Sequence, residues 1–162
     1  MYKFVKGPYP SKEEILEDRP SIETCFEPSI IDFCNQWKKD IWQIHKGGKT
    51  KERFEALRML IQEICLLKPK IQMARVRLDE NASTPYYIPS NITIFLNKHL
   101  SIISALHELG HHLYGESELL ACRFSVHLFK EIFPKAFSKL VWTNNMFRKD
   151  KDICESAQPA LI

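Results

Sequence analysis

The chain of 162 residues lacks several features that would identify its class at once. It has no apolar run long enough to span a membrane, and its N-terminus carries no apolar segment of signal-peptide length. Its five cysteines are scattered and form no CxxC pair, so we expect reduced thiols in a cytoplasmic protein. Neither sign of charge dominates, since 23 Lys and Arg residues stand against 20 Asp and Glu residues. These absences argue against secreted, membrane-spanning, collagenous and disulfide-rich classes.

The sequence is long enough for one domain with its own hydrophobic core. Four prolines in residues 1–28 predict an extended N-terminal arm, with one or two helical turns in the polar stretch 11–18. We expect residues 29–150 to form a single domain and residues 151–162 to form a flexible tail. No internal repeat or low-complexity tract divides the chain.

The spacing of apolar residues predicts an α+β fold. Residues 74–78 alternate between apolar and charged side chains, which indicates a half-exposed strand. We expect residues 86–96 to form a second extended stretch, kinked at Pro89. Apolar residues recur at helical spacing in five segments, which are residues 29–45, 50–68, 98–114, 117–133 and 136–150. The prediction is therefore a mostly helical single domain with a small sheet.

The motif His107-Glu-Leu-Gly-His111 carries the clearest chemical signal. Two imidazoles at positions i and i+4 lie on the same face of a helix, where both can bind one metal ion. Glu108 is rotated by about 100° from His107 on a helix, which suits a general base beside Zn²⁺. A chain of this length and composition would contain an HExxH motif by chance about 0.02 times. We therefore predict a zinc site at His107 and His111, with Glu108 as the catalytic base.

A catalytic zinc ion needs a third protein ligand, and the residues after the motif offer several. Glu118 is favoured, because it opens the next helix and is followed by the small side chains expected where two helices approach closely. His127 lies about 180° around that helix from Glu118, so both cannot face one ion. Glu116 falls in the turn after Gly115, and His112 points to the same side as Glu108. These three remain the alternatives.

The motif and its continuation, Glu118-Leu-Leu-Ala121-Cys-Arg-Phe124-Ser125, resemble the HELGH…ExxAxxFA pattern of the ImmA/IrrE-like metallopeptidases. The similarity covers roughly residues 74–133. It implies a zincin-like domain of the gluzincin type, in which His107, His111 and Glu118 bind zinc and Glu108 is the base. The chain departs from the family in the short spacing between His111 and Glu118 and in Ser125, where alanine is usual. The SprT-like proteases are a weaker match, and their third ligand would have to be His127.

The predicted function is a zinc-dependent peptidase that cuts an intracellular protein, which the resemblance implies could be a transcriptional regulator such as a repressor. An edge strand within residues 86–96 would hold the substrate as an extended peptide. The donor to the developing oxyanion stays open among five side chains, which are Tyr86, Tyr87, His112, Tyr114 and His127. The alternative is a catalytically silent module that binds a protein or DNA, with the basic loop 45–53 as a possible nucleic-acid contact.

Overall fold

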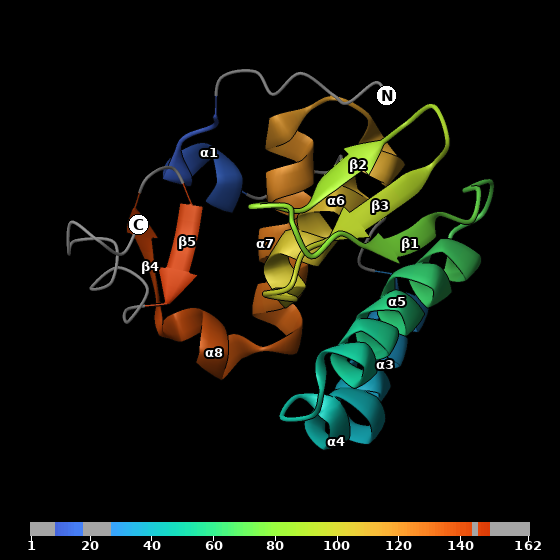
Figure 1. Cartoon of the computed structure of the whole chain (residues 1–162). Coiled ribbons are helices and arrows are strands. Elements are labelled where there is room, and N and C mark those ends of the chain that lie inside the picture. Colours follow the sequence, from blue (N-terminus) through green and yellow to red (C-terminus); the bar gives the residue numbers. More distant parts are fainter. Residues whose placement is uncertain (1–8, 18–26, 144–145, 150–162) are drawn as a thin grey trace.

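The computed structural model describes residues 9–17, 27–143 and 146–149. These residues form a mostly helical structure with small sheets, which confirms the predicted mixture of helices and strands, although there are two sheets where the sequence predicts one. Figure 1 shows a three-stranded sheet lying across helix α6, with the helices α3 to α5 on one side and helix α8 and a β-hairpin on the other. Within the described residues, no helix combines the length and the apolar character needed to cross a membrane.

The first predicted helix, residues 29–45, is confirmed, with one irregularity. It consists of α3 (Pro28–Trp37), a π-helical turn η2 (Lys38–Trp42) and α4 (Gln43–His45). The wider π turn brings Trp37 and Trp42 to the same side, where their rings stack with centroids 5.5 Å apart. The second predicted helix is α5 (Thr50–Leu67), whose apolar stripe packs against Trp37 and the rest of α3.

The sheet has the strand order β1-β3-β2, with β1 (Arg75–Leu78) parallel to β3 (Thr93–Leu96) and β2 (Tyr86–Ile88) antiparallel to it. Val76, Ile94 and Tyr87 are register partners across the sheet, and all three are buried. The half-exposed strand predicted for residues 74–78 is thus confirmed.

The prediction of one kinked strand over residues 86–96 is wrong. The segment forms two strands, because the chain turns at residues 89–92, where the Ile92 amide donates to the Pro89 carbonyl at 3.3 Å. Ile92 itself has a positive φ of 54°. Pro89, Ser90 and Asn91 are all residues that favour turns, and this signal outweighs the apolar alternation on either side. The consequence is that β2 is an outer strand of the three-stranded sheet that the described residues form.

Two antiparallel helices follow, α6 (Ile102–Tyr114) and α7 (Glu118–Ile132), close to their predicted bounds. The start of α6 is later than expected, because residues 97–100 form a turn that ends at Leu100 with φ 49°. Serine side chains cap both N-termini: Ser101 accepts from the Ser104 amide, and Ser117 accepts from the Leu120 amide.

The prediction of a helix over residues 136–150 is wrong. Only α8 (Pro134–Ser138) is helical there, and it is followed by an antiparallel hairpin of β4 (Leu140–Thr143) and β5 (Met146–Lys149). Leu140-Val141-Trp142-Thr143 is rich in β-branched and aromatic side chains, and two asparagines stand between the strands in the sequence. These local preferences outweigh the weak helical spacing. The tail predicted for residues 151–162 lies outside the described residues.

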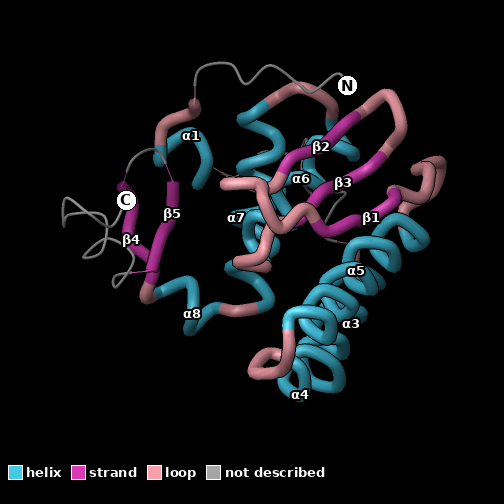
Figure 2. Tube along the Cα trace, in the orientation of Figure 1, coloured by secondary structure: helices cyan, strands magenta, loops and turns pink. Residues whose placement is uncertain are grey.

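The N-terminal stretch 11–18 contains the predicted short helix, α1 (Lys12–Leu16), which packs on α7. Ile15 is fully buried there, and its carbonyl accepts from His127 Nε2 at 2.9 Å. Arg123, itself buried, donates from Nε to the Glu14 carbonyl at 2.8 Å. Figure 2 shows that α1 and the β4–β5 hairpin lie on the same side of α7, apart from the three-stranded sheet.

Candidate metal centre

The centre depends on a close approach of α6 and α7. Gly110 on α6 faces Ala121 on α7, and a Cβ atom at position 110 would lie 2.8 Å from the Ala121 Cα. Only glycine therefore fits at this position of the motif. Because the two helices meet here, the side chains that flank the contact on either helix point into a shared space.

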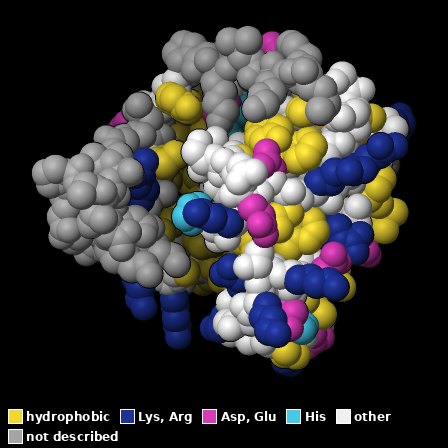
Figure 3. Space-filling view, in the orientation of Figure 1, with side chains coloured by type: hydrophobic (Ala, Val, Ile, Leu, Met, Phe, Trp, Pro, Cys, Tyr) yellow, Lys and Arg dark blue, Asp and Glu magenta, His cyan; other side chains and the backbone are white. Residues whose placement is uncertain are grey.

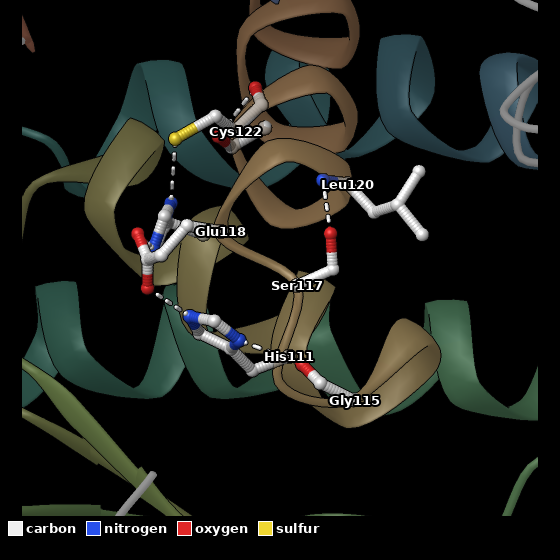
Figure 4. Close-up of polar contacts among 8 residues, drawn as sticks. His111, Gly115, Ser117, Glu118, Leu120 and Cys122 are labelled. Atoms are coloured by element: carbon white, nitrogen blue, oxygen red, sulfur yellow. Dashed lines mark hydrogen bonds and ion pairs between the residues drawn. The ribbon is translucent and has the colours of Figure 1, made fainter. Parts of the chain in front are cut away.

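Glu118 lies between the two histidines of the motif. Its Oε1 is 2.8 Å from His111 Nε2, and its Oε2 is 3.2 Å from His107 Nε2. The Glu118 and His111 side chains are nearly inaccessible, with 4% and 3% exposure, whereas His107 is 17% exposed. Figure 4 shows Glu118 reaching from the start of α7 toward His111 on α6. The structure thus brings together the three side chains predicted as zinc ligands.

The outward nitrogen of each ring also has a partner. His111 Nδ1 donates to the Gly115 carbonyl at 2.8 Å. That carbonyl is positioned by the turn between the helices, in which Gly115 takes φ 84° and ψ −146°, a conformation open to glycine alone. His107 Nδ1 lies 3.7 Å from Cys122 Sγ. Partners at Nδ1 fix the ring orientation and leave each Nε2 directed at Glu118, as in metal sites where Nε2 is the ligand.

The electrostatics of the cluster favour a cation. Burial alone would raise the pKa of Glu118, but the contacts with His107 and His111 lower it far below its usual range. Burial acts to lower the pKa of His111, yet Glu118, the Gly115 carbonyl and the charge of Glu108 together raise it. The buried Glu118 carboxylate stays ionised beside the His111 imidazole, which favours its charged form, so positive charge is stabilised at this place.

The residues present fit a zinc ion. Glu118 Oε2 is buried, and its contact with His107 is not aligned as a hydrogen bond, so this oxygen has no hydrogen-bond partner among the described residues. Two imidazole nitrogens and one carboxylate form the donor set of many catalytic zinc sites, which keep a further position open. His107, Glu118 and Cys122 also offer three potential ligand atoms within 4.8 Å of one another.

Glu108 is buried and lines a cavity of about 440 Å³ together with His111. The other walls come from the loop 79–85 and from Tyr86 and Tyr87 of β2. Asn97 Nδ2 holds this loop by donating to the Ser83 carbonyl at 3.0 Å. The cavity gives the predicted base an open space beside His111 and strand β2.

The alternative third ligands lie elsewhere. His112 Nε2 donates to the Gln72 carbonyl at 2.6 Å, and its Nδ1 accepts from the Tyr87 hydroxyl at 2.9 Å. His127 is engaged by the Ile15 carbonyl of α1. Glu116 is exposed in the turn after Gly115. Among the described residues, Glu118 is the carboxylate that contacts both histidines.

The structure also distinguishes the five predicted oxyanion donors, because only some of them line the cavity beside Glu108. Tyr86 and Tyr87 line the cavity beside Glu108, but the Tyr86 hydroxyl donates to Asp79 Oδ2 at 2.7 Å. Burial, together with the hydrogen bond and charge of Asp79, raises the pKa of Tyr86 to about 12, so its hydroxyl keeps its proton. The Tyr114 hydroxyl is buried. Tyr86 and Tyr87 are thus the two candidates that line the same cavity as the predicted base.

Sequence reasoning missed two contributions to the centre. Gly110 could have been recognised, because a glycine between two metal-binding histidines in a helix interior costs stability and so indicates a close contact. The position of Cys122, one turn after Glu118, indicates that its thiol could approach the metal, although a small buried thiol is the simpler interpretation. Its contact with His107 Nδ1 depends on the crossing of two helices, which has no local signal.

In the structure, the positive charge of the loop 45–53 is partly offset by a neighbouring acidic side chain. Lys46, Lys49 and Lys51 are exposed, but a Cβ at Gly48 would lie 2.3 Å from a Glu52 carboxylate oxygen, so an acidic group stands among them. Figure 3 shows Lys and Arg side chains interspersed with Asp and Glu over this end of the helices. The nucleic-acid contact stays a prediction.

Comparison of the chain with protein-family models, with curated proteins and with solved structures gave no match in any of the three.

Proposed function

We propose that the protein is a zinc-dependent peptidase of the ImmA/IrrE-like type, with a zincin-like domain, which cuts extended segments of a protein in the cytoplasm. The observation that carries this proposal is the contact of Glu118 with both His107 and His111 at a buried position, beside a cavity that Glu108 lines. A transcriptional regulator is the substrate that the sequence resemblance favours.

His107, His111 and Glu118 would hold the zinc ion. Bound there, the ion would supply a Lewis acid that acidifies water and polarises the peptide carbonyl. Glu108, buried at the wall of the cavity, would accept the proton of the attacking water. The same carboxyl group would then give that proton to the leaving amine as the C–N bond breaks. The Gly115 carbonyl and Cys122 would keep the imidazoles oriented throughout.

The position of β2 at one side of the three-stranded sheet supports an extended substrate. Tyr86 and Tyr87 of this strand line the same cavity as Glu108, so a peptide paired with β2 would pass close to the base. Pro85 and Pro89 flank the strand and limit the pairing to a few residues. Such a short pairing favours chain segments that are already unfolded or flexible.

The first experiment is elemental analysis of the zinc-loaded wild type beside Glu118→Ala and His127→Ala. We expect one zinc per chain in the wild type and in His127→Ala and a loss of zinc in Glu118→Ala. Loss confined to His127→Ala would instead support the SprT-like ligand set. The absence of zinc from every form would contradict the proposal.

The second experiment tests catalysis with Glu108→Gln. This change should retain zinc but lower the cleavage of a mixture of unstructured peptides by about 10³-fold, because the base is removed while the ligands remain. Unchanged cleavage would exclude Glu108 as the base. Zinc binding without cleavage in the wild type would favour the alternative, a catalytically silent module that binds a protein or DNA partner.

A further inference from the structure

A second cavity, of about 190 Å³, touches the candidate metal centre on α7. His107, Glu108 and Glu118 form part of its wall, and Thr84 and Pro85 belong to the walls of both this cavity and the larger one. The two cavities therefore meet at the predicted base. A peptide that crosses Glu108 would have one of them on each side of the bond to be cut.

The walls away from the metal centre are mostly apolar and come from the two ends of the described chain. Tyr9 and Ile15 belong to the N-terminal segment, and Trp142, Met146 and Phe147 belong to the β4–β5 hairpin. Ile103 of α6 and Val126 of α7 complete the apolar surface. The larger cavity differs, because the loop 79–85 contributes the polar side chains of Asp79, Asn81 and Ser83 to it alone.

These walls are held firmly. Arg123 and His127 fix α1 to α7 through the carbonyls of Glu14 and Ile15. In the hairpin, the Trp142 and Phe147 rings are in edge-to-face contact at 5.1 Å, and Phe147 also packs on Phe137 of α8. An apolar cavity with fixed walls rewards the burial of a side chain of matching shape.

We propose that this cavity receives one bulky apolar side chain of the substrate, of the Phe, Leu or Met class, next to the bond that is cut. The inference rests on the proposed peptidase function and adds a preference to it. The size supports a single side chain, since cavities for whole small-molecule ligands measure about 300–1,000 Å³. The position supports a substrate, because His107, Glu108 and Glu118 at the cavity wall are the residues proposed to bind zinc and to act on the adjacent peptide bond.

The test uses two peptide hydroxamates, whose hydroxamate group binds zinc. The two compounds differ only in the side chain of the residue next to the hydroxamate, which is benzyl in one and methyl in the other. Titration calorimetry with the zinc-loaded full chain measures their dissociation constants without any turnover. We expect the benzyl compound to bind at least about tenfold more tightly, because it buries more apolar surface. In a parallel assay, mass spectrometry of a digested peptide mixture should find cuts concentrated beside Phe, Leu and Met.

Two variants from separate walls locate the effect, and a third serves as the control. Trp142→Ala removes a wall of the hairpin, and Tyr9→Ala changes the N-terminal wall at an exposed position where misfolding is not expected. Both should reduce the benzyl preference, with Trp142→Ala lowering it to about threefold or less. Val141→Ala, on the same strand but outside the lining, should keep it.

The outcomes separate the two proposals. A chain that binds zinc and both hydroxamates equally well, or that keeps its preference in Trp142→Ala and Tyr9→Ala, would overturn the side-chain cavity and leave the peptidase proposal standing. A chain that binds neither zinc nor hydroxamate would overturn both.

Discussion

The two helix pairs of the molecule are built on opposite principles. The pair α3 and α5 buries almost only apolar groups, among them Ile30, Trp37, Leu60 and Ile61. Of the seven buried polar or charged side chains in the described part of the chain, five lie on α6 or α7, which are Glu108, His111, Glu118, Arg123 and Ser125. Burying such groups costs free energy unless they are paired. The difference indicates that α3 and α5 mainly stabilise the fold. In α6 and α7, the buried polar groups lower the free energy of unfolding but form the candidate metal centre.

The largest effect should come from the apolar pair. Leu60→Ala removes a fully buried side chain from α5 and should lower the free energy of unfolding by about 3 kcal/mol. Zinc content should stay at one per chain, because Leu60 belongs to the apolar core and lines neither of the two cavities beside the candidate metal centre. Urea denaturation and elemental analysis measure the two quantities. Met59→Ala, at the neighbouring exposed position, is the control, and loss of zinc in Leu60→Ala would break the division between the pairs.

Zinc should raise the free energy of unfolding through its ligands on α6 and α7. At a free concentration of 100 times its dissociation constant, a metal that binds only the folded chain adds about 2.7 kcal/mol to the free energy of unfolding. Thermal denaturation with zinc and with a chelator measures this difference. Glu118→Ala should remove the zinc-dependent gain, since the carboxylate that joins both histidines is lost. An equal gain in Glu118→Ala would show that zinc binds elsewhere.

Gly110→Ala tests the close approach of α6 and α7. The added Cβ meets the backbone of Ala121, so the helices must separate, at a cost of about 2 kcal/mol in the free energy of unfolding. Because His111 and Glu118 would also move apart, zinc affinity should fall, which titration with a competing chelator measures. Gly47→Ala is the matched control, since a Cβ there has no atom within 4 Å. Unchanged zinc affinity in Gly110→Ala would show that the centre does not need this contact.

The smallest effect concerns the attachment of α1. His127→Ala removes the hydrogen bond to the Ile15 carbonyl and should cost about 1 kcal/mol. Amide hydrogen exchange should become faster in residues 12–16, while zinc content stays unchanged. His45→Ala, at the far end of α4, should leave that exchange as it is. A loss of zinc in His127→Ala would return His127 to the list of ligands.

The sequence predicts the four long helices well, because each has an apolar stripe at helical spacing and a residue that ends it. It fails where two local signals compete. In residues 86–96 and 140–149 the turn residues and β-branched side chains outweigh the periodicity that suggested one strand and one helix. The π turn at η2 leaves no pattern of its own, since the apolar spacing on either side of it reads as a single helix.

The site was predictable in its polar residues and not in its surroundings. HExxH spacing places two imidazoles on one helix face, and the small residues after Glu118 indicate a close helix contact, so the cluster follows from local sequence. The contacts of Arg123 with Glu14 and of His127 with Ile15 join residues more than a hundred positions apart. No local sequence pattern indicates such pairs. The cavity beside α1, which these contacts help to form, could therefore not be predicted from the sequence.

The docking of α1 on α7 also sets an order of events during synthesis. The residues of α1 leave the ribosome first, yet Arg123 and His127, which hold them, are made 109 and 112 residues after their partners. The hairpin that forms the opposite wall is made later still. A nascent chain can therefore contain both histidines and Glu118 before the hairpin residues that line the second cavity have been made. The hairpin side of the cavity is complete only after translation has passed residue 149, so the side-chain preference proposed for this cavity would require that the hairpin has been made.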